Sequence, residues 1–295
     1  MAKYKKKLNA EKLNKFLSDY FDGIEHIDAA FYLKYPYLDL IIEVPITEKR
    51  YKCINKAKKI LQNVLFITQA MNLLLGNYEE YLITIKKVLN PWHEPNGNID
   101  LFKNLVARKL SNLLSSTYAY TEHTRKLYHQ VKSSPSFDTF KDQHINNNSI
   151  LEEVRNYSQH TGLPIHQIKF DQNGLEIFVD LVRLKDAKDR NRSLIERCSE
   201  RVINVTNIMP GYIKNLWLLH VEIIECLNKL LLSSDKIIID AINEIKIISK
   251  NSKLDCAILV ENKLKIIEQF ISLDSKRLFD LYTRENHAIY SRTFN

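Results

Sequence analysis

Apolar residues recur at helical spacing along most of the chain. Between residues 48 and 75, for example, Ile54, Ala57 and Leu61 repeat every three or four positions, which is the period of one face of an α-helix. Gly76 is expected to end this helix, because glycine is common just past a helix C-terminus. The same spacing predicts further helices over 9–21, 78–89, 99–131, 149–161, 190–207, 211–232, 235–249, 254–272 and 275–284. The predicted fold class is therefore mainly α, a helical bundle.

One stretch alternates instead of following the helical period. The segment 165–184 places apolar side chains at every second position on both sides of Asn173-Gly174. This dipeptide supplies the positive φ angles that a tight hairpin turn needs. The sequence thus predicts one small β-hairpin near 165–184. The run 38–44 can also be interpreted as a strand.

No repeat of fixed period and no low-complexity linker divides the chain. We expect a helical or extended N-terminal segment over 1–47, a helical bundle with the hairpin over 48–232, and a C-terminal helical extension over 233–295. One continuous domain is the alternative.

Glycine is scarce, and its spacing excludes two common phosphate-binding loops. The chain has 295 residues and 6 glycines, at positions 23, 76, 97, 162, 174 and 211. A Walker-type loop needs two glycines five positions apart, and a dinucleotide-binding fingerprint needs three within six residues. Neither pattern is present, so any phosphate that the protein handles must be bound mainly by side chains.

Positive charge is concentrated in the first half of the chain. The formal net charge is +8. Residues 1–148 hold 22 Lys and Arg against 15 Asp and Glu, whereas residues 149–295 hold 21 against 20. Such an excess suits a polyanionic partner such as RNA, although a solvated basic tail over 3–7 contributes to the same sum.

The chain shows neither a membrane span nor a secretion signal. No segment approaches about 18 uninterrupted apolar residues, and no hydrophobic stretch follows the basic start. A cytoplasmic protein that does not contact a membrane is therefore expected. The four cysteines form no CxxC pair, which predicts buried free thiols rather than a disulfide or a zinc site.

Residues 149–161 form a helix whose two ends are both marked in the sequence. Ser149 and Glu152 match a capping box, in which each side chain satisfies a backbone N–H of the first turn. Gly162 can take a left-handed closing conformation, and Pro164 prevents continuation.

This helix carries an arginine and a histidine beside its apolar face. Ile150, Val154 and Tyr157 share the face that should meet the core. Arg155 and His160 then project to the two flanks, roughly 140° apart and about 7.5 Å along the axis. One helix alone does not bring these two side chains together.

The sequence RNYSQH at residues 155–160 resembles the R-x4-6-H motif of the HEPN superfamily, including the polar residue, here Asn156, that commonly follows the arginine. HEPN domains are small helical bundles, often dimeric. Many are metal-independent endoribonucleases in RNA processing, toxin–antitoxin and antiviral defence systems. The resemblance covers roughly residues 48–232, with its specific signal in the motif. Gly162 stands where the nucleotidyltransferase-paired branch has a tyrosine, so regulation through that tyrosine is not carried over.

The resemblance implies RNA cleavage by transesterification without a cofactor. The ribose 2′-OH attacks the adjacent phosphate and leaves a 2′,3′-cyclic phosphate and a 5′-OH. His160 would exchange the proton, since an imidazole titrates near neutral pH. Arg155 would bind the phosphate and stabilise the phosphorane, and Asn156 would orient the imidazole or contact a phosphate oxygen.

Because each chain has one Arg/His set, we expect an antiparallel homodimer with one shared cleft. An antitoxin or defence-system protein is the further partner implied.

The motif residues also have structural interpretations. Arg155 can pair with Glu152 or Gln159 on a solvated face. His160 can cap the helix C-terminus, where the macrodipole favours a positive charge. Tyr157 is expected in the core rather than in the chemistry.

Four further basic residues are candidates for RNA contact, namely Arg125, Lys126, His129 and His166. The alternative for the first three is a solvated charged face, because Glu122 and Lys126, like Arg125 and His129, have i,i+4 spacing. The alternative for His166 is a structural role at the start of a strand.

The second functional hypothesis is a non-catalytic helical module that binds RNA or a partner protein. An ion pair that locks Arg155 within the molecule would favour this module, whereas a basic cleft over Arg155 would favour the nuclease. No HExxH motif and no paired HxH occurs, so a metal-dependent hydrolase is not expected.

Overall fold

The computed structural model describes residues 31–34, 43–87, 99–131, 149–161, 165–171, 174–185, 201–249, 253–263 and 265–294. The helices are α2 (Glu48–Lys87), α3 (Ile99–Val131), α5 (Ser149–Thr161), α6 (Leu181–Lys185), α8 (Val205–Ser249) and α9 (Asp274–Phe294). The strands are β1 (Phe31–Lys34), β2 (Glu43–Pro45), β3 (Ile165–Asp171), β4 (Gly174–Asp180), β5 (Val202–Asn204), β6 (Cys256–Lys263) and β7 (Lys265–Ser272).

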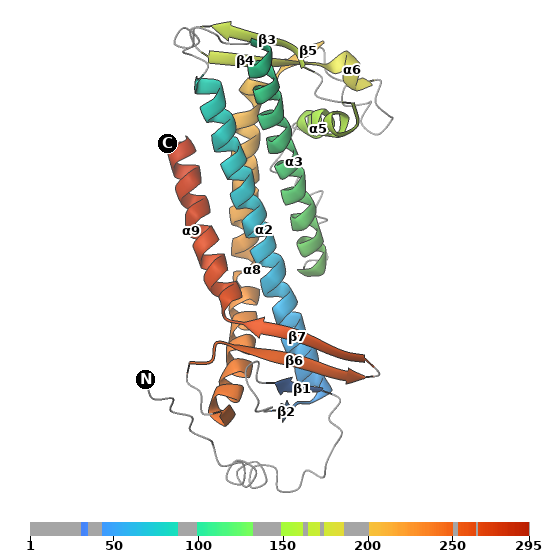
Figure 1. Cartoon of the computed structure of the whole chain (residues 1–295), viewed down its shortest axis with the longest axis vertical. Coiled ribbons are helices and arrows are strands. Elements are labelled where there is room, and N and C mark those ends of the chain that lie inside the picture. Colours follow the sequence, from blue (N-terminus) through green and yellow to red (C-terminus); the bar gives the residue numbers. More distant parts are fainter. Residues whose placement is uncertain are drawn as a thin grey trace, which may run out of the picture.

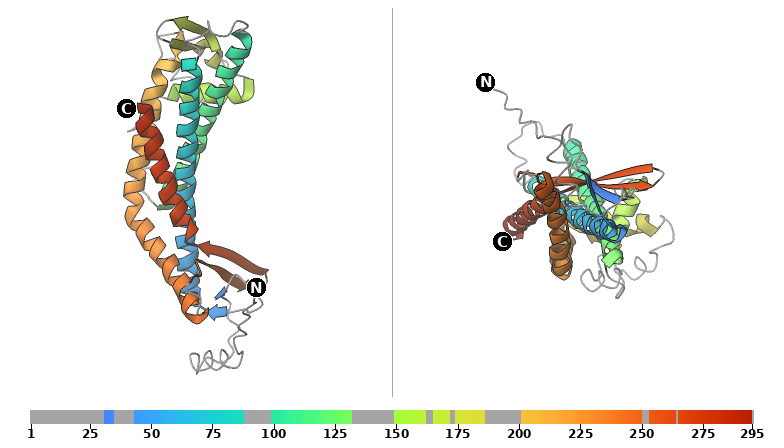
Figure 2. Two further views of the ribbon diagram at one scale, coloured as in Figure 1. Left: turned by 60° about the vertical axis from the view of Figure 1, so that its left-hand side comes forward. Right: turned by 90° about the horizontal axis from the view of Figure 1, so that it is seen from below.

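Long helices form the body of the molecule (Figure 1). α2 is the central one, because α3, α8 and α9 all pack against it. α3 and α8 run antiparallel to α2, and α9 runs parallel to it (Figures 1 and 2). With 40 residues, α2 is about 60 Å long at a rise of 1.5 Å per residue. The mainly helical fold predicted from the sequence is confirmed.

The core consists of the apolar stripes of these helices. On α2, Ile67, Leu74 and Leu75 are completely buried, and each such side chain contributes about 1.5–3 kcal/mol to stability. Asn286 of α9 is also completely buried, and its Nδ2 donates a hydrogen bond to the backbone oxygen of Thr68 at 3.0 Å. This bond fixes the position of α9 along α2.

A small antiparallel sheet lies at each end of the bundle (Figure 1). The sheet with strand order β2-β1-β6-β7 lies where α2 begins, and the sheet β3-β4-β5 lies where α2 ends. β3 and β4 pair directly, with Ile168 opposite Ile177, so the predicted hairpin is confirmed.

The hairpin ends earlier than its predicted limit of residue 184. Leu181 and Leu184 lie in α6, where both are buried. The change to a helix is explained by Asp180, whose Oδ1 accepts a hydrogen bond from the backbone N–H of Val182 at 2.8 Å. An aspartate in this position caps the first turn of a helix.

The segment 254–272 was predicted as a helix, and that prediction is wrong. It forms the hairpin β6–β7, and β6 also pairs with β1, which places Leu33 opposite Leu259. Consecutive residues of β6, including Leu259 and Val260, are buried. A strand that is apolar on both faces imitates helical spacing, and the partner that decides the outcome comes from the other end of the sequence.

The predicted helix end at Gly76 is also wrong. Gly76 lies inside α2, which continues to Lys87. Leu75 and Tyr78 extend the buried stripe across this position. The burial outweighs the cost of about 1 kcal/mol that glycine carries inside a helix.

Other elements also have bounds that differ from those predicted. α8 joins the predicted helices 211–232 and 235–249, and Ser233 stays helical with its Oγ donating to the backbone oxygen of Leu230 at 3.0 Å. α9 continues ten residues beyond the predicted end at residue 284. The end of the predicted helix 190–207 is instead β5 followed by α8. Residues 9–21, 38–42 and 186–200 lie outside the described residues.

The cysteine prediction is confirmed in part. Cys53, Cys226 and Cys256 are free thiols, but only Cys256 is buried. Cys53 of α2 and Cys226 of α8 are exposed, so the prediction of burial is wrong for them. Cys198 lies outside the described residues. Within the described part of the chain, no helix combines the length and the hydropathy needed to cross a membrane.

Candidate functional site

The motif helix α5 packs on the outside of α3, near the end of the bundle that carries β3, β4 and β5 (Figure 1). Its bounds are those predicted from the capping residue Ser149 and the stop after Thr161. Leu151 and Val154 are buried and hold α5 against the core, and Ile150 packs partly against it. The predicted apolar face therefore meets the core.

Arg155 does not lie on a solvated flank of α5. Its residue surface is only 9% exposed. The guanidinium carbon lies 3.4 Å from the centroid of the Tyr118 ring on α3. This is a cation–π contact, in which the negative face of the ring attracts the cation.

The guanidinium is also held by the residue next to it. Nη1 of Arg155 donates a hydrogen bond to Oδ1 of Asn156 at 2.7 Å. Nδ2 of Asn156 in turn donates to Oε1 of Glu153 at 3.3 Å. The Nε of Arg155 is buried and has no hydrogen-bond partner. One N–H of the candidate phosphate-binding cation is thus unsatisfied.

No ion pair of Arg155 with a carboxylate occurs among the described residues. Glu152, one of its predicted partners, lies instead near Tyr212 of α8. Burial raises the pKa of the Tyr212 hydroxyl, and the negative charge of Glu152 raises it further. The charge of Arg155 is therefore compensated by a ring face and an amide oxygen, not by an acid.

His160 lies in the last turn of α5, five residues after Arg155. Its side chain is outside what the structure describes. Along the helix the two residues are separated by about 7.5 Å and by roughly 140°. Their convergence on one phosphate stays a prediction.

The other predicted RNA contacts lie on two elements. Arg125 forms an ion pair with Glu122 within α3, which is an i,i+3 pair rather than either predicted i,i+4 pair. Lys126 and His129 are exposed on the same helix. Arg125 follows Tyr118 by seven residues, so it lies on the same side of α3, about 10.5 Å further along.

His166 lies on β3 beside a buried carboxylate. Its Nδ1 is 4.0 Å from Oδ2 of Asp180, and the His166 side chain is 45% exposed. Asp180 also caps α6 through its other oxygen. This arrangement agrees with the structural interpretation of His166 and leaves one side of the imidazole open to solvent.

Tyr118 is the residue of this site that the sequence did not reveal. It is 42% exposed, and the sequence places it inside a long helix next to several other aromatic and hydroxyl side chains. Its role depends on the packing of α5 against α3. No local pattern carries that information.

The described residues contain no group of three or more His, Cys, Asp or Glu that could hold a metal ion. Comparison of the chain with protein-family models, with curated proteins and with solved structures finds no match.

Proposed function

We propose that this protein is a metal-independent endoribonuclease of the HEPN type, which cleaves RNA by transesterification. The observation that carries the proposal is the state of Arg155. It is a positioned guanidinium that has no carboxylate partner among the described residues. Such a group is suited to a phosphate, whose oxygens accept charge-assisted hydrogen bonds from arginine.

The reaction needs no metal and no co-reactant. The ribose 2′-OH loses its proton to His160 and its oxygen attacks the neighbouring phosphorus. The bond from phosphorus to the 5′-oxygen breaks, and that oxygen takes the proton back from the protonated His160. Arg155 stabilises the negative charge that develops on the phosphorane. Asn156, through its bond to Nη1, keeps the guanidinium in one orientation.

The decisive experiment measures cleavage of total RNA and of tRNA in EDTA by the wild-type protein and by Arg155→Ala and His160→Ala. Loss of a general acid–base group lowers a rate by about 10²–10⁴-fold, and loss of a group that stabilises the transition-state charge lowers it by about 10²–10³-fold. We expect losses of these sizes in His160→Ala and Arg155→Ala, respectively. Arg284→Ala and His287→Ala are the matched controls, because both residues are exposed on α9. Products ending in 2′,3′-cyclic phosphate are expected. Undiminished cleavage by both motif variants would overturn the proposal.

The shared cleft of an antiparallel homodimer is part of the proposal. A dimer unites two copies of α5, and so supplies a second Arg155 and a second His160. Mixed dimers of Arg155→Ala and His160→Ala protomers retain one intact group of each kind. We expect these mixed dimers to cleave RNA, whereas each variant alone does not. A strictly monomeric protein in analytical ultracentrifugation would exclude this arrangement.

Such an activity suits a toxin or an antiviral effector. It would act in the cytoplasm, where RNA is accessible. Induced expression of the wild-type protein should then arrest growth, and expression of His160→Ala should not. Release from arrest by a co-expressed protein encoded by a neighbouring gene would identify the antitoxin or defence-system partner.

The alternative is a non-catalytic helical module that binds RNA or a partner protein. The burial of nine-tenths of Arg155 against Tyr118 favours it, since a packed arginine also serves as a structural bridge. It predicts no cleavage under any condition and, if the ligand is RNA, binding that weakens steeply with salt. The cleavage assay above separates the two.

A further inference from the structure

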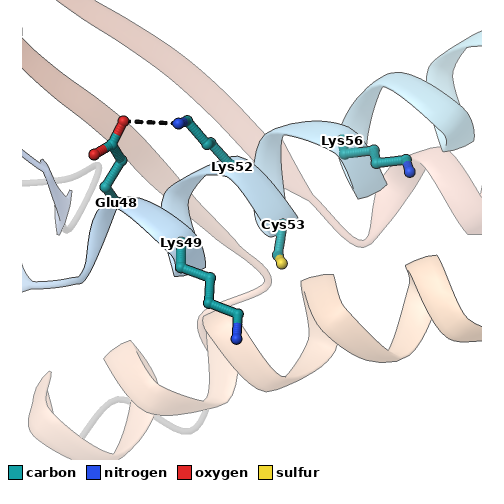
Figure 3. Close-up of a pocket in the computed structure, with 5 residues that line it drawn as sticks. All are labelled: Glu48, Lys49, Lys52, Cys53 and Lys56. Atoms are coloured by element: carbon teal, nitrogen blue, oxygen red, sulfur yellow. Dashed lines mark ion pairs between the residues drawn. The ribbon is translucent and has the colours of Figure 1, made fainter.

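A pocket of about 420 Å³ lies at the start of α2, far from the motif helix (Figure 3). Its lining residues are Glu48, Lys49, Lys52, Cys53 and Lys56. All of them come from the first three turns of one helix. Figure 1 shows that α2 begins beside β1, β6 and β7, whereas α5 lies toward the opposite end of the bundle.

The lining has a surplus of positive charge. Glu48 is the one carboxylate among the described lining residues, and it forms an ion pair with the ammonium of Lys52 at 2.8 Å. Lys49 and Lys56 form no ion pair with any carboxylate among the described residues. Figure 3 shows Lys52 turned toward Glu48, while Lys49 and Cys53 point to the other side, toward α8. Two ammonium groups are therefore left to meet a ligand.

The same end of α2 carries further basic residues, and Glu244 of α8 and Glu261 of β6 compensate part of their charge. Residues 48–59 hold six Lys and Arg and a single acid. Arg50 is paired with Glu244 of α8 at 2.9 Å. The Nζ of Lys58 donates a hydrogen bond to Oε1 of Gln269 at 3.4 Å. Burial, and then the charge of Lys59, lower the pKa of Lys58.

We infer that this pocket binds the phosphate backbone of single-stranded RNA, at a second site separate from the Arg155 motif. Lys49 and Lys56 are seven residues apart, about 10.5 Å along the axis. That separation exceeds the size of one phosphate, so the two ammonium groups are matched to different phosphates of a polymer. The lining residues lie on three turns of one helix, so their side chains form one short row. A single row suits a single strand of RNA.

The inference is independent of catalysis. It concerns binding at one end of α2, and a protein without nuclease activity can satisfy it. If the proposed nuclease is correct, an RNA long enough to follow the bundle contacts this pocket and α5 together. The test therefore uses a 2′-O-methyl oligonucleotide, which lacks the attacking 2′-OH and cannot be cleaved by transesterification.

The first measurement is the Kd of the full-length protein for this labelled oligonucleotide, by fluorescence anisotropy at several salt concentrations. Each phosphate contact with a single strand contributes about 0.7 to the slope of log K against log salt. We expect Lys49→Gln/Lys56→Gln to lower that slope by about 1.4 and to weaken binding on the order of tenfold at moderate salt. Lys86→Gln/Lys214→Gln, which removes two exposed lysines at the other end of the bundle, is the matched control. An equal loss in both double variants would overturn the inference.

The second measurement uses Cys53 as a reporter in the unmodified protein. Its thiol is exposed in the pocket lining, and Cys226 is an exposed thiol on α8 that serves as the internal control. Saturating oligonucleotide should slow alkylation of Cys53 by iodoacetamide at least fivefold, measured by mass spectrometry, and leave Cys226 unchanged. Unchanged labelling of Cys53 would overturn the inference. Equal protection by inorganic phosphate at the same ionic strength would also overturn it, because the pocket would then be a small-anion site.

Discussion

The guanidinium carbon of Arg155 lies 3.4 Å from the centre of the Tyr118 ring, so α3 holds the one arginine of helix α5 in place. The ring restrains the plane of the guanidinium, and Oδ1 of Asn156 restrains its rotation through Nη1. A cation held in this way has lost its conformational freedom before a ligand arrives. Preorganised charge of this kind stabilises a transition state with little further reorganisation.

Removal of the Tyr118 ring should weaken the proposed nuclease. We expect Tyr118→Ala to lower the single-turnover cleavage rate about tenfold, because a cation–π contact contributes about 0.5–2 kcal/mol and 1.4 kcal/mol corresponds to a factor of ten. Tyr118→Phe keeps the ring and should cleave at nearly the wild-type rate. A wild-type rate in Tyr118→Ala would show that the ring does not position Arg155 for catalysis.

Asn156 should act through the same guanidinium. Asn156→Ala removes the acceptor of the Nη1 hydrogen bond. We expect the cleavage rate to fall severalfold, since Asn156 is exposed and a typical hydrogen bond contributes about 0.5–1.5 kcal/mol. Combined with Tyr118→Ala, the loss should be smaller than the product of the two single losses, because both residues restrain one group. Strictly multiplicative losses in this double-mutant cycle would argue for two independent roles.

The parts of the site that the sequence revealed are those set by neighbours along the chain. Ser149 marked the start of α5, and Val154 marked its buried face, because capping and helical period are local properties. The contact between Arg155 of α5 and Tyr118 of α3 joins two residues that are 37 positions apart in the sequence. Neither local helix propensity nor the spacing of residues along the chain predicts such a contact.

The same distinction explains the errors in the fold. β6 was predicted as a helix because its apolar run fits both periods, and its pairing with β1 joins opposite ends of the chain. The basic pocket is a different case, because Lys49, Cys53 and Lys56 share one helix face at i, i+4 and i+7. That pattern was visible in the sequence.

Gly76 offers a test of how the central helix is stabilised. It lies in the interior of α2, and a Cβ added there meets nothing within 4 Å. We expect Gly76→Ala to raise the free energy of unfolding in urea by about 1 kcal/mol, because alanine loses less backbone entropy in a helix than glycine. Gly211 of α8 has the same open surroundings, so Gly211→Ala should add a similar gain independently. A loss of stability in Gly76→Ala would mean that the helix needs a kink at this position.

The stability of the bundle should fall at mildly acidic pH because of His220. This residue of α8 is buried, with the Tyr120 ring of α3 centred 5.7 Å away and the Trp217 ring 5.8 Å away. Its Nδ1 has no hydrogen-bond partner. Burial, and then the charge of His287 on α9, lower the pKa of His220 from 6.5 to about 3. The folded protein therefore keeps this imidazole neutral at pH values where the unfolded chain protonates it.

The direction of the effect follows from proton uptake by the unfolded state. His220 costs no stability above about pH 6.5, and the cost grows as the pH falls toward 3, by about 1.4 kcal/mol per pH unit. Between pH 7.5 and pH 5.0, urea unfolding should show a loss of about 2 kcal/mol in the wild type that His220→Leu lacks. His287→Gln, which replaces the exposed imidazole near Trp217, should keep most of the loss. If His220→Leu loses as much stability as the wild type over this range, carboxylates elsewhere in the fold account for the acid sensitivity, and the neutral buried imidazole does not.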